Sequence, residues 1–125
     1  MADLDVRPFG IGLVVSDVDG TLITPDKRLT PRTAAAVRRL RGEGIHFALA
    51  STRPPFGLAQ FVEPLGLTTP LIACAGAITV RPDTGEVLSS RPLPGPLVLE
   101  LLEVAAELEL DVRLFWGDHW AVPSL

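Results

Sequence analysis

The chain has 125 residues, of which 47% are apolar and 21% charged, and its formal net charge is −4. This length suits one domain or part of a larger one, and the positive mean hydropathy argues against disorder. With 11 basic and 15 acidic residues there is no positive excess for a nucleic-acid backbone, so we expect no nucleic-acid partner. The sequence has no apolar run near the ~18 residues of a membrane span and no secretion signal, which predicts a cytoplasmic protein without a membrane partner.

The first part of the chain alternates predicted strands and helices. Apolar, β-branched runs are typical of buried strands, and Thr30 followed by Pro31 is a favourable helix start. Such alternation predicts parallel strand pairing with right-handed crossovers. The expected order is a buried strand at 11–16, a helix at 31–41, a buried strand at 45–50, a helix at about 55–63 ended by Pro64 and Gly66, and a strand at 71–74.

The pattern changes after residue 76. Residues 77–80 and 86–89 flank a Pro-Asp-Thr-Gly turn, which predicts a hairpin. An amphipathic helix is expected at 97–110. Residues 112–115 and 120–122 predict a second hairpin around Gly117 and Asp118. We therefore place a boundary near residues 76–92 and expect two parts, an α/β layer at 1–80 and the start of an α+β unit at 81–125.

The strongest local signal is Asp17-Val18-Asp19-Gly20-Thr21-Leu22, directly after the first strand. In an open parallel sheet the carboxyl ends of the strands face the ligand crevice, which would place Asp17 at its floor. Gly20 allows a sharp turn that exposes backbone amides. Two carboxylates two residues apart repel each other, and an oxygen-rich site of this kind suits Mg²⁺.

A carboxylate can also attack a phosphoryl group, while a neighbouring acid protonates the leaving group and later deprotonates water. Two other interpretations of this motif are a capped turn with solvated aspartates and a calcium loop. The calcium loop's D-x-[DN]-x-[DN]-G spacing is absent. The apolar strand before the motif and Thr21-Leu22 within it favour the catalytic interpretation.

DVDGTL resembles motif I of the haloacid dehalogenase superfamily in the form that its phosphatases use. Residues 50–54 (ASTRP) are similar to the "A-T-G-R-P" of the Cof-type branch. Residues 72–77 (IACAGA) resemble that branch's "I-x-x-N-G-A", and 82–87 resemble the hairpin that leads into its inserted cap. The resemblance covers nearly the whole chain. It implies a partial Rossmann-like parallel sheet with helices on both faces, followed by the beginning of the α+β cap.

The resemblance also implies site roles, carried over residue by residue. Asp17 would be the nucleophile and a Mg²⁺ ligand. Asp19 would be the general acid/base, and its backbone carbonyl would also touch the metal. Ser51 would bind the transferring phosphoryl group. Gly20 and Thr21 would steady the phosphate or the loop. Arg53 would hold substrate or a structural carboxylate, and the alternative for this residue is a surface or packing role.

Two family motifs have no clear counterpart. No lysine follows Lys27, so the motif III lysine is absent from this chain, and Lys27 itself is expected to be a solvated loop cation. Trp116-Gly117-Asp118-His119 resembles motif IV only superficially, and Asp118 is expected to be a turn residue. In "N-G-A" the asparagine is replaced by Ala75, and Thr52 stands where motif II has glycine.

The favoured function is a Mg²⁺-dependent phosphatase of small phosphorylated metabolites that forms an aspartyl-phosphate, impaired in this chain without motifs III and IV. The alternatives are a non-catalytic remnant that binds phosphate or a partner, and an interaction fragment whose only hint is the acidic helix face of Glu100, Glu103 and Glu107. Because the resemblance places further strands after the cap, we expect the first strand to have an unpaired side. A second copy of the chain would then cover this exposed sheet edge.

Overall fold

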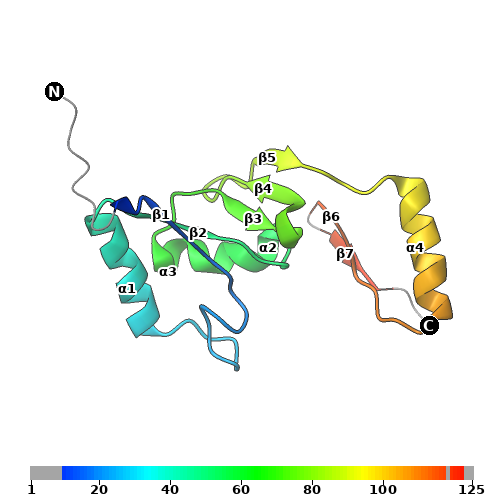
Figure 1. Cartoon of the computed structure of the whole chain (residues 1–125), viewed down its shortest axis with the longest axis horizontal. Coiled ribbons are helices and arrows are strands. Elements are labelled where there is room, and N and C mark those ends of the chain that lie inside the picture. The colour runs from blue at the N-terminus through cyan, green and yellow to red at the C-terminus, as the bar shows by residue number, and fades with distance from the viewer. Residues whose placement is uncertain (1–9, 118, 123–125) are drawn as a thin grey trace. The chain divides into compact units, whose positions relative to one another are not determined.

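The computed structural model describes residues 10–117 and 119–122, and the chain divides into two compact units, Met1–Ser90 and Arg91–Leu125 (Figure 1). The first unit contains the parallel strand pair and the crossover helices expected from the sequence, so the α/β class is confirmed. Its elements are β1 (Leu13–Ser16), α1 (Pro31–Gly42), β2 (His46–Leu49), α2 (Pro55–Leu58), η2 (Ala59–Phe61), α3 (Val62–Leu65), β3 (Leu71–Ala73), η3 (Cys74–Gly76), β4 (Ile78–Val80) and β5 (Val87–Ser90).

The strands of this unit pair in two ways. β1 and β2 are parallel, with Leu13 opposite His46 and Ser16 opposite Leu49. A single parallel bridge between Ala50 and Ile72 connects the end of β2 to β3. β3, β4 and β5 pair antiparallel in that order, which confirms the predicted hairpin and keeps β5 within the first unit.

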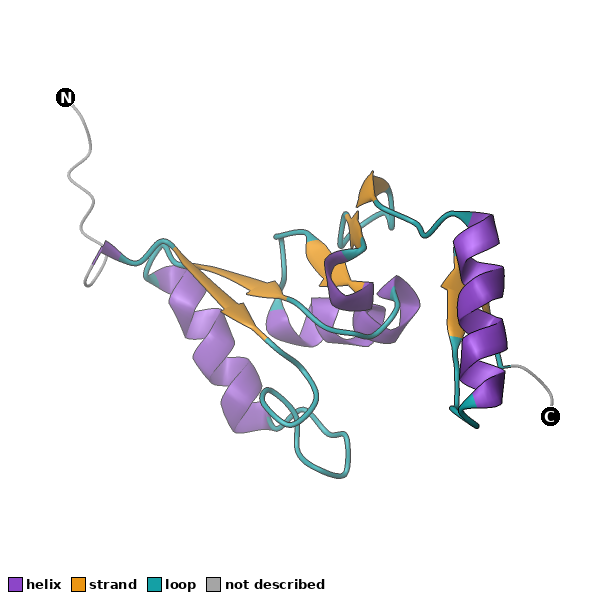
Figure 2. Ribbon diagram, turned by 45° about the vertical axis from the view of Figure 1, so that its right-hand side comes forward, coloured by secondary structure: helices purple, strands orange, loops and turns teal. Residues whose placement is uncertain are grey.

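The helices of the first unit begin and end at residues with recognisable capping or helix-breaking properties. The Thr30 hydroxyl accepts the Thr33 amide at 3.1 Å and caps α1, as predicted. Figure 2 draws helices as purple ribbons and strands as orange arrows. The single helix expected near 55–63 is instead three short consecutive segments, α2, η2 and α3, and Pro64 lies inside the last. Proline is tolerated there because the first amides of a helix have no intrahelical acceptor. Gly66, at a φ of 63°, ends α3.

The core lies between the parallel strands and the helices. Leu49, Leu58 and Val18 are its largest fully buried side chains. In β1, however, Leu13 and Val15 are 53% and 51% exposed, so the expectation of a strand buried on both faces is wrong. The reason is that, among the described residues, β1 pairs only with β2 and nothing covers these alternate side chains.

The second unit consists of α4 (Gly95–Glu107) and an antiparallel hairpin of β6 (Leu114–Trp116) and β7 (His119–Ala121). Both elements agree with the predicted helix and hairpin. Glu100, Glu103 and Glu107 are exposed on α4. Asp118 lies outside the described residues. None of the helices in the described part of the chain has the length and apolar character needed to cross a membrane.

Candidate active site

The loop after β1 turns around the backbone of one buried residue, Val18. Its side chain is fully buried, and its carbonyl oxygen accepts the amides of Thr21, Leu22 and Ile23 at 3.3, 3.0 and 3.2 Å. Gly20 has a φ of 78°, a conformation that costs a residue with a Cβ about 1–2 kcal/mol. The loop is therefore closed on itself, with Asp17 and Asp19 on either side of the buried Val18.

Asp17 lies at the carboxyl end of β1 and is exposed. Among the described residues, its carboxylate is bound by the Thr21 hydroxyl alone, which donates to Oδ2 across a long 3.4 Å. The Thr21 amide donates to the Val18 carbonyl, so the amide and the hydroxyl of Thr21 both make hydrogen bonds within the loop. The Asp17 carboxylate is thus left available to a substrate.

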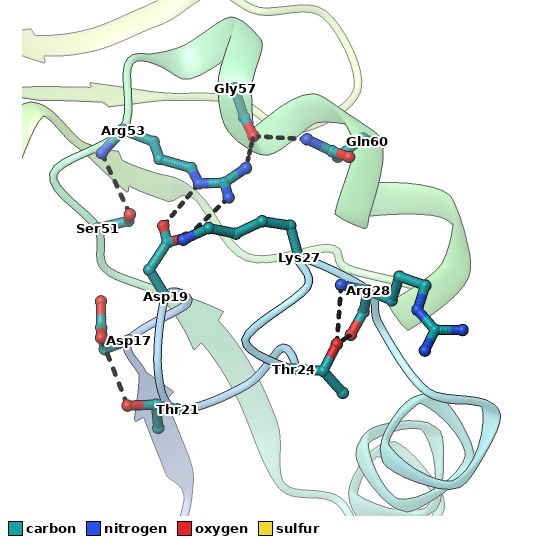
Figure 3. A network of polar contacts seen from close by, with 10 residues as sticks. All are labelled: Asp17, Asp19, Thr21, Thr24, Lys27, Arg28, Ser51, Arg53, Gly57 and Gln60. Carbon is teal, nitrogen blue, oxygen red and sulfur yellow. Dashed lines mark hydrogen bonds and ion pairs between the residues drawn. The ribbon is translucent and has the colours of Figure 1, made fainter.

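Ser51 lies at the same edge of the strand pair, after the end of β2 (Figure 3). The Ala50 amide donates to the Ser16 carbonyl at 3.0 Å and holds the two strand ends together. Ser51 is only 6% exposed, and its hydroxyl oxygen accepts the Arg53 amide at 3.1 Å. Asp17 and Ser51 therefore follow the ends of two adjacent parallel strands.

Arg53 binds the Asp19 carboxylate with two hydrogen bonds. Nε donates to Oδ2 at 2.7 Å and Nη2 to Oδ1 at 2.9 Å, the bidentate geometry that gives strong and directional pairing. The guanidinium is itself fixed, because Nη1 donates to the Gly57 carbonyl at 3.3 Å and the group lies over the Phe61 ring at 5.5 Å. Arg53 therefore holds a carboxylate in this structure, and that carboxylate is Asp19.

Lys27 is a second cation on Asp19 that the sequence analysis missed. Its Nζ donates to Asp19 Oδ1 at 2.7 Å, so Lys27 is not simply a solvated loop cation (Figure 3). Hydrogen bonds from Arg53 and then Lys27 lower the pKa of Asp19 well below its usual range, and that carboxyl is ionised at neutral pH. The one signal of this contact in the sequence is that Lys27 is the only lysine in the chain and lies eight residues after Asp19.

A third strand end supports the Arg53 loop through strained backbone. Cys74 and Ala75 have φ values of 49° and 55°, unusual for residues with a side chain. In this conformation the Cys74 amide donates to the Arg53 carbonyl at 2.9 Å and the Ala75 amide to the Ser51 carbonyl at 3.0 Å. Asparagine adopts positive φ more readily than alanine, which gives a physical meaning to its place in the "N-G-A" pattern.

The oxygen atoms of the loop fit a magnesium site of limited ligand number. No group of three acidic, histidine or cysteine side chains that could hold a metal occurs in the residues for which the structure gives positions. Mg²⁺ is, however, often held by one or two carboxylates together with waters and substrate phosphate. The Asp17 carboxylate and the Asp19 carbonyl meet that description, whereas the Asp19 carboxylate is already paired with two cations.

Comparison with known proteins gives the family. Residues 14–125 match the haloacid dehalogenase-like hydrolases. The chain is 33% identical over 106 residues to the pyridoxal phosphate phosphatase YbhA of Escherichia coli, covering 85% of this chain and 39% of that protein. It is 30% identical to the HMP-PP phosphatase of Serratia proteamaculans over 116 residues, which cover 90% of this chain and 42% of the relative.

Solved structures agree. A haloacid dehalogenase-like hydrolase from Bacteroides thetaiotaomicron superposes with a TM-score of 0.74 at 25% identity, covering 90% of this chain and 43% of that one. One from B. subtilis gives 0.80 at 23% identity, covering 92% and 40%, and shares the fold. The chain belongs to the haloacid dehalogenase-like hydrolases, as its motifs predict, and it spans less than half the length of these relatives.

Proposed function

We propose that this chain carries the nucleophile half of a Mg²⁺-dependent phosphatase active site that acts on small phosphorylated metabolites. The observation that carries the proposal is the placement of an accessible Asp17 at the carboxyl end of a parallel strand, beside Ser51 and two residues from Asp19. Relatives named as phosphatases of pyridoxal phosphate, HMP-PP and 5-amino-6-(5-phospho-D-ribitylamino)uracil support this substrate class. The cytoplasmic location stays a prediction from the sequence.

In the first step, an Asp17 carboxylate oxygen attacks phosphorus, and the bond from phosphorus to the ester oxygen breaks. The product is an aspartyl-phosphate, and the departing alkoxide takes a proton from Asp19. Ser51, Thr21 and Arg53 steady the phosphoryl oxygens or the loops that surround them, and Gly20 gives the turn its shape. A bound Mg²⁺ would supply positive charge to the phosphoryl oxygens beside Asp17 and the Asp19 carbonyl.

In the second step, water attacks the phosphorus of the aspartyl-phosphate and the Asp17–phosphorus bond breaks. Asp19 removes the proton of that water. The pairing of its carboxylate with Arg53 and Lys27 keeps it ionised and therefore free to accept a proton, but the same pairing lowers its basicity. To serve as the acid of the first step, Asp19 must take up a proton, and this requires at least one of the two cations to leave its carboxylate.

We expect the 125-residue chain, assayed by itself, to be slow. Phosphoryl transfer depends mostly on positioning and on positive charge, and losing such charge costs about three or more powers of ten in rate. No lysine follows Lys27 in this sequence, and the described residues place no third acidic side chain beside Asp17 and Asp19 that could complete a metal site. A chain that binds phosphate without turnover is therefore the second candidate.

Turnover of p-nitrophenyl phosphate with and without Mg²⁺ tests the proposal. We expect Mg²⁺-dependent turnover that falls at least about a thousandfold in Asp17→Asn, because the nucleophile is lost. Asp26→Asn, in an exposed turn nearby, serves as the matched control and leaves turnover unchanged. Equal turnover in Asp17→Asn overturns the enzymatic proposal.

If the wild-type chain does not turn over substrate, beryllofluoride binding followed by ¹⁹F NMR distinguishes a phosphate-binding remnant from an interaction fragment. A signal that Asp17→Asn abolishes supports the phosphate-binding remnant. The absence of both turnover and binding overturns both candidates and favours the interaction fragment.

A further inference from the structure

We propose that Lys27 is a ligand of the substrate's phosphate, held on Asp19 until that phosphate arrives. This inference rests on the proposed phosphatase function and adds a residue to its site. Arg53 and Lys27 share the Asp19 carboxylate unequally, because Arg53 makes two hydrogen bonds to it and Lys27 makes one.

The turn that carries Lys27 is built to aim it at the site. Thr24 and Arg28 close the turn, because the Thr24 amide donates to the Arg28 carbonyl and the Arg28 amide to the Thr24 hydroxyl, both at 3.0 Å. Lys27 has a φ of 64°, a left-handed conformation in which few residues other than glycine, asparagine and aspartate are found. Figure 3 shows its side chain extended across the loop to Asp19.

Asp19 does not need Lys27 for neutralisation. Arg53 alone satisfies both carboxylate oxygens, and Lys27 adds a second donor to Oδ1, which Arg53 Nη2 already occupies. The Lys27 ammonium therefore brings an additional positive charge to a loop whose other acid, Asp17, is the candidate nucleophile.

The charge balance of the site with phosphate and a divalent cation bound indicates what the positive charge of Lys27 contributes. Asp17 and Asp19 contribute two negative charges, and Lys27 and Arg53 two positive charges, so the four side chains sum to zero. A phosphate ester carries close to two negative charges at pH 7, which a divalent cation would offset. Without Lys27 the same loaded site would have one uncompensated negative charge.

Of the two cations, Lys27 is the one that is free to move. Arg53 is 22% exposed and is fixed by the Gly57 carbonyl, the Phe61 ring and two bonds to Asp19. The Lys27 side chain is 63% exposed, makes a single bond at the end of a flexible stem, and needs only rotation of its own χ angles to leave Asp19. An arriving phosphate therefore draws the ammonium of Lys27 rather than the guanidinium of Arg53.

Calorimetric binding of inorganic phosphate in the presence of Mg²⁺ tests the inference. We expect Lys27→Met to weaken binding about tenfold, the size of one charged hydrogen bond, and Lys27→Arg to retain most of it. The matched control is Arg28→Met, which removes the same charge from the same turn but whose partner is Asp26. Equal affinity in wild type and Lys27→Met overturns this inference alone, whereas a wild type that binds no phosphate overturns the proposed function as well.

A double-mutant comparison separates direct contact from an effect through Asp19. In an Asp19→Asn background, a direct phosphate ligand still matters, and Lys27→Met weakens phosphate binding by a similar factor. If Lys27→Met has no effect in that background, Lys27 acts only by holding Asp19 and the inference fails.

The single lysine also permits a direct spectroscopic test. Reductive methylation with ¹³C-formaldehyde labels Lys27 and the N-terminal amine, and no other lysine exists in the chain. Phosphate should shift the Lys27 methyl resonance and leave the N-terminal resonance in place as the internal reference. Phosphate binding without a shift at Lys27 contradicts a direct contact.

Discussion

Asp19 is the residue at which the charged side chains of the site meet. A carboxylate with three charge-assisted hydrogen bonds is held in one orientation, and the accompanying fall in its pKa couples the pairing to pH. The pairing therefore contributes to the stability of the first unit, and it also sets the protonation state of Asp19.

We expect Arg53→Met to lower the free energy of unfolding at pH 7 by about 1 kcal/mol, a modest value because the pair is partly exposed. The folded-state pKa of Asp19 lies below its unfolded value of about 3.9, so this contribution is present above that value and declines as the pH falls below it. Urea unfolding of both proteins at several pH values from neutral to acid measures the difference.

Arg81→Met is the matched control, because Arg81 pairs with Glu86 through one bond and both partners are about half exposed. Its effect on unfolding should be close to zero at every pH. A cost for Arg53→Met that stays constant as the solution is acidified would show that packing on Phe61, rather than the ion pair, is what the mutation removes.

Sequence reasoning located some site residues and missed others for a physical reason. Asp17 is singled out by its place at a strand end and Ser51 by the resemblance of its segment to a family motif, and the two residues follow adjacent parallel strands. The position of Lys27 depends on a left-handed turn, and the pairing of Arg53 depends on an orientation set by Gly57 and Phe61. Neither contact leaves a periodic signal in the sequence, and the only local hint of the first is that the single lysine lies eight residues after Asp19.

At the scale of elements, the short η3 turn holds the Ser51–Arg53 loop by two backbone hydrogen bonds made in left-handed conformation. Alanine is a poor residue for this conformation, whereas glycine adopts it without a Cβ penalty. The turn is therefore a place where a single substitution should raise stability.

We expect Ala75→Gly to raise the free energy of unfolding by about 0.5–1 kcal/mol, because relief of the positive φ outweighs the added freedom of the unfolded chain. Ala77→Gly is the control two residues away. Ala77 is also exposed but has a φ of −69°, so glycine there should destabilise by a similar amount. Urea unfolding measures both, and a loss of stability in both variants would contradict strain at Ala75.

The predicted elements agree best with the structure where pattern and capping act together. α1 begins at its Thr30 cap and the Pro82–Gly85 turn forms the predicted hairpin. The segment from 55 to 65 breaks into three pieces because proline and glycine at several positions permit only short helical runs, and apolar content alone does not report such breaks.

At the scale of the whole chain, the exposed face of β1 has the strongest consequence. Leu13 and Val15 project to the same side and are about half exposed, on a strand that pairs on one side only among the described residues. Exposed apolar strands with a free edge associate with other chains.

We therefore expect the 125-residue chain to self-associate through β1, and light scattering after size-exclusion chromatography should give a mass above that of one chain. Leu13→Lys with Val15→Lys should shift this mass toward the monomer. Phe56→Lys is the control, because Phe56 is an exposed apolar side chain on helix α2 and not on a strand edge, and it should leave the mass unchanged. A monomeric wild type at high concentration would contradict this expectation.

The burial of Val18 between two acids has a mechanical consequence. The Val18 side chain is buried in the core and its carbonyl accepts three amides, so this residue fixes the backbone between Asp17 and Asp19. We expect a substitution that enlarges or hollows position 18 to displace Asp17 and Asp19 together, which in the proposed mechanism are the nucleophile and the proton carrier.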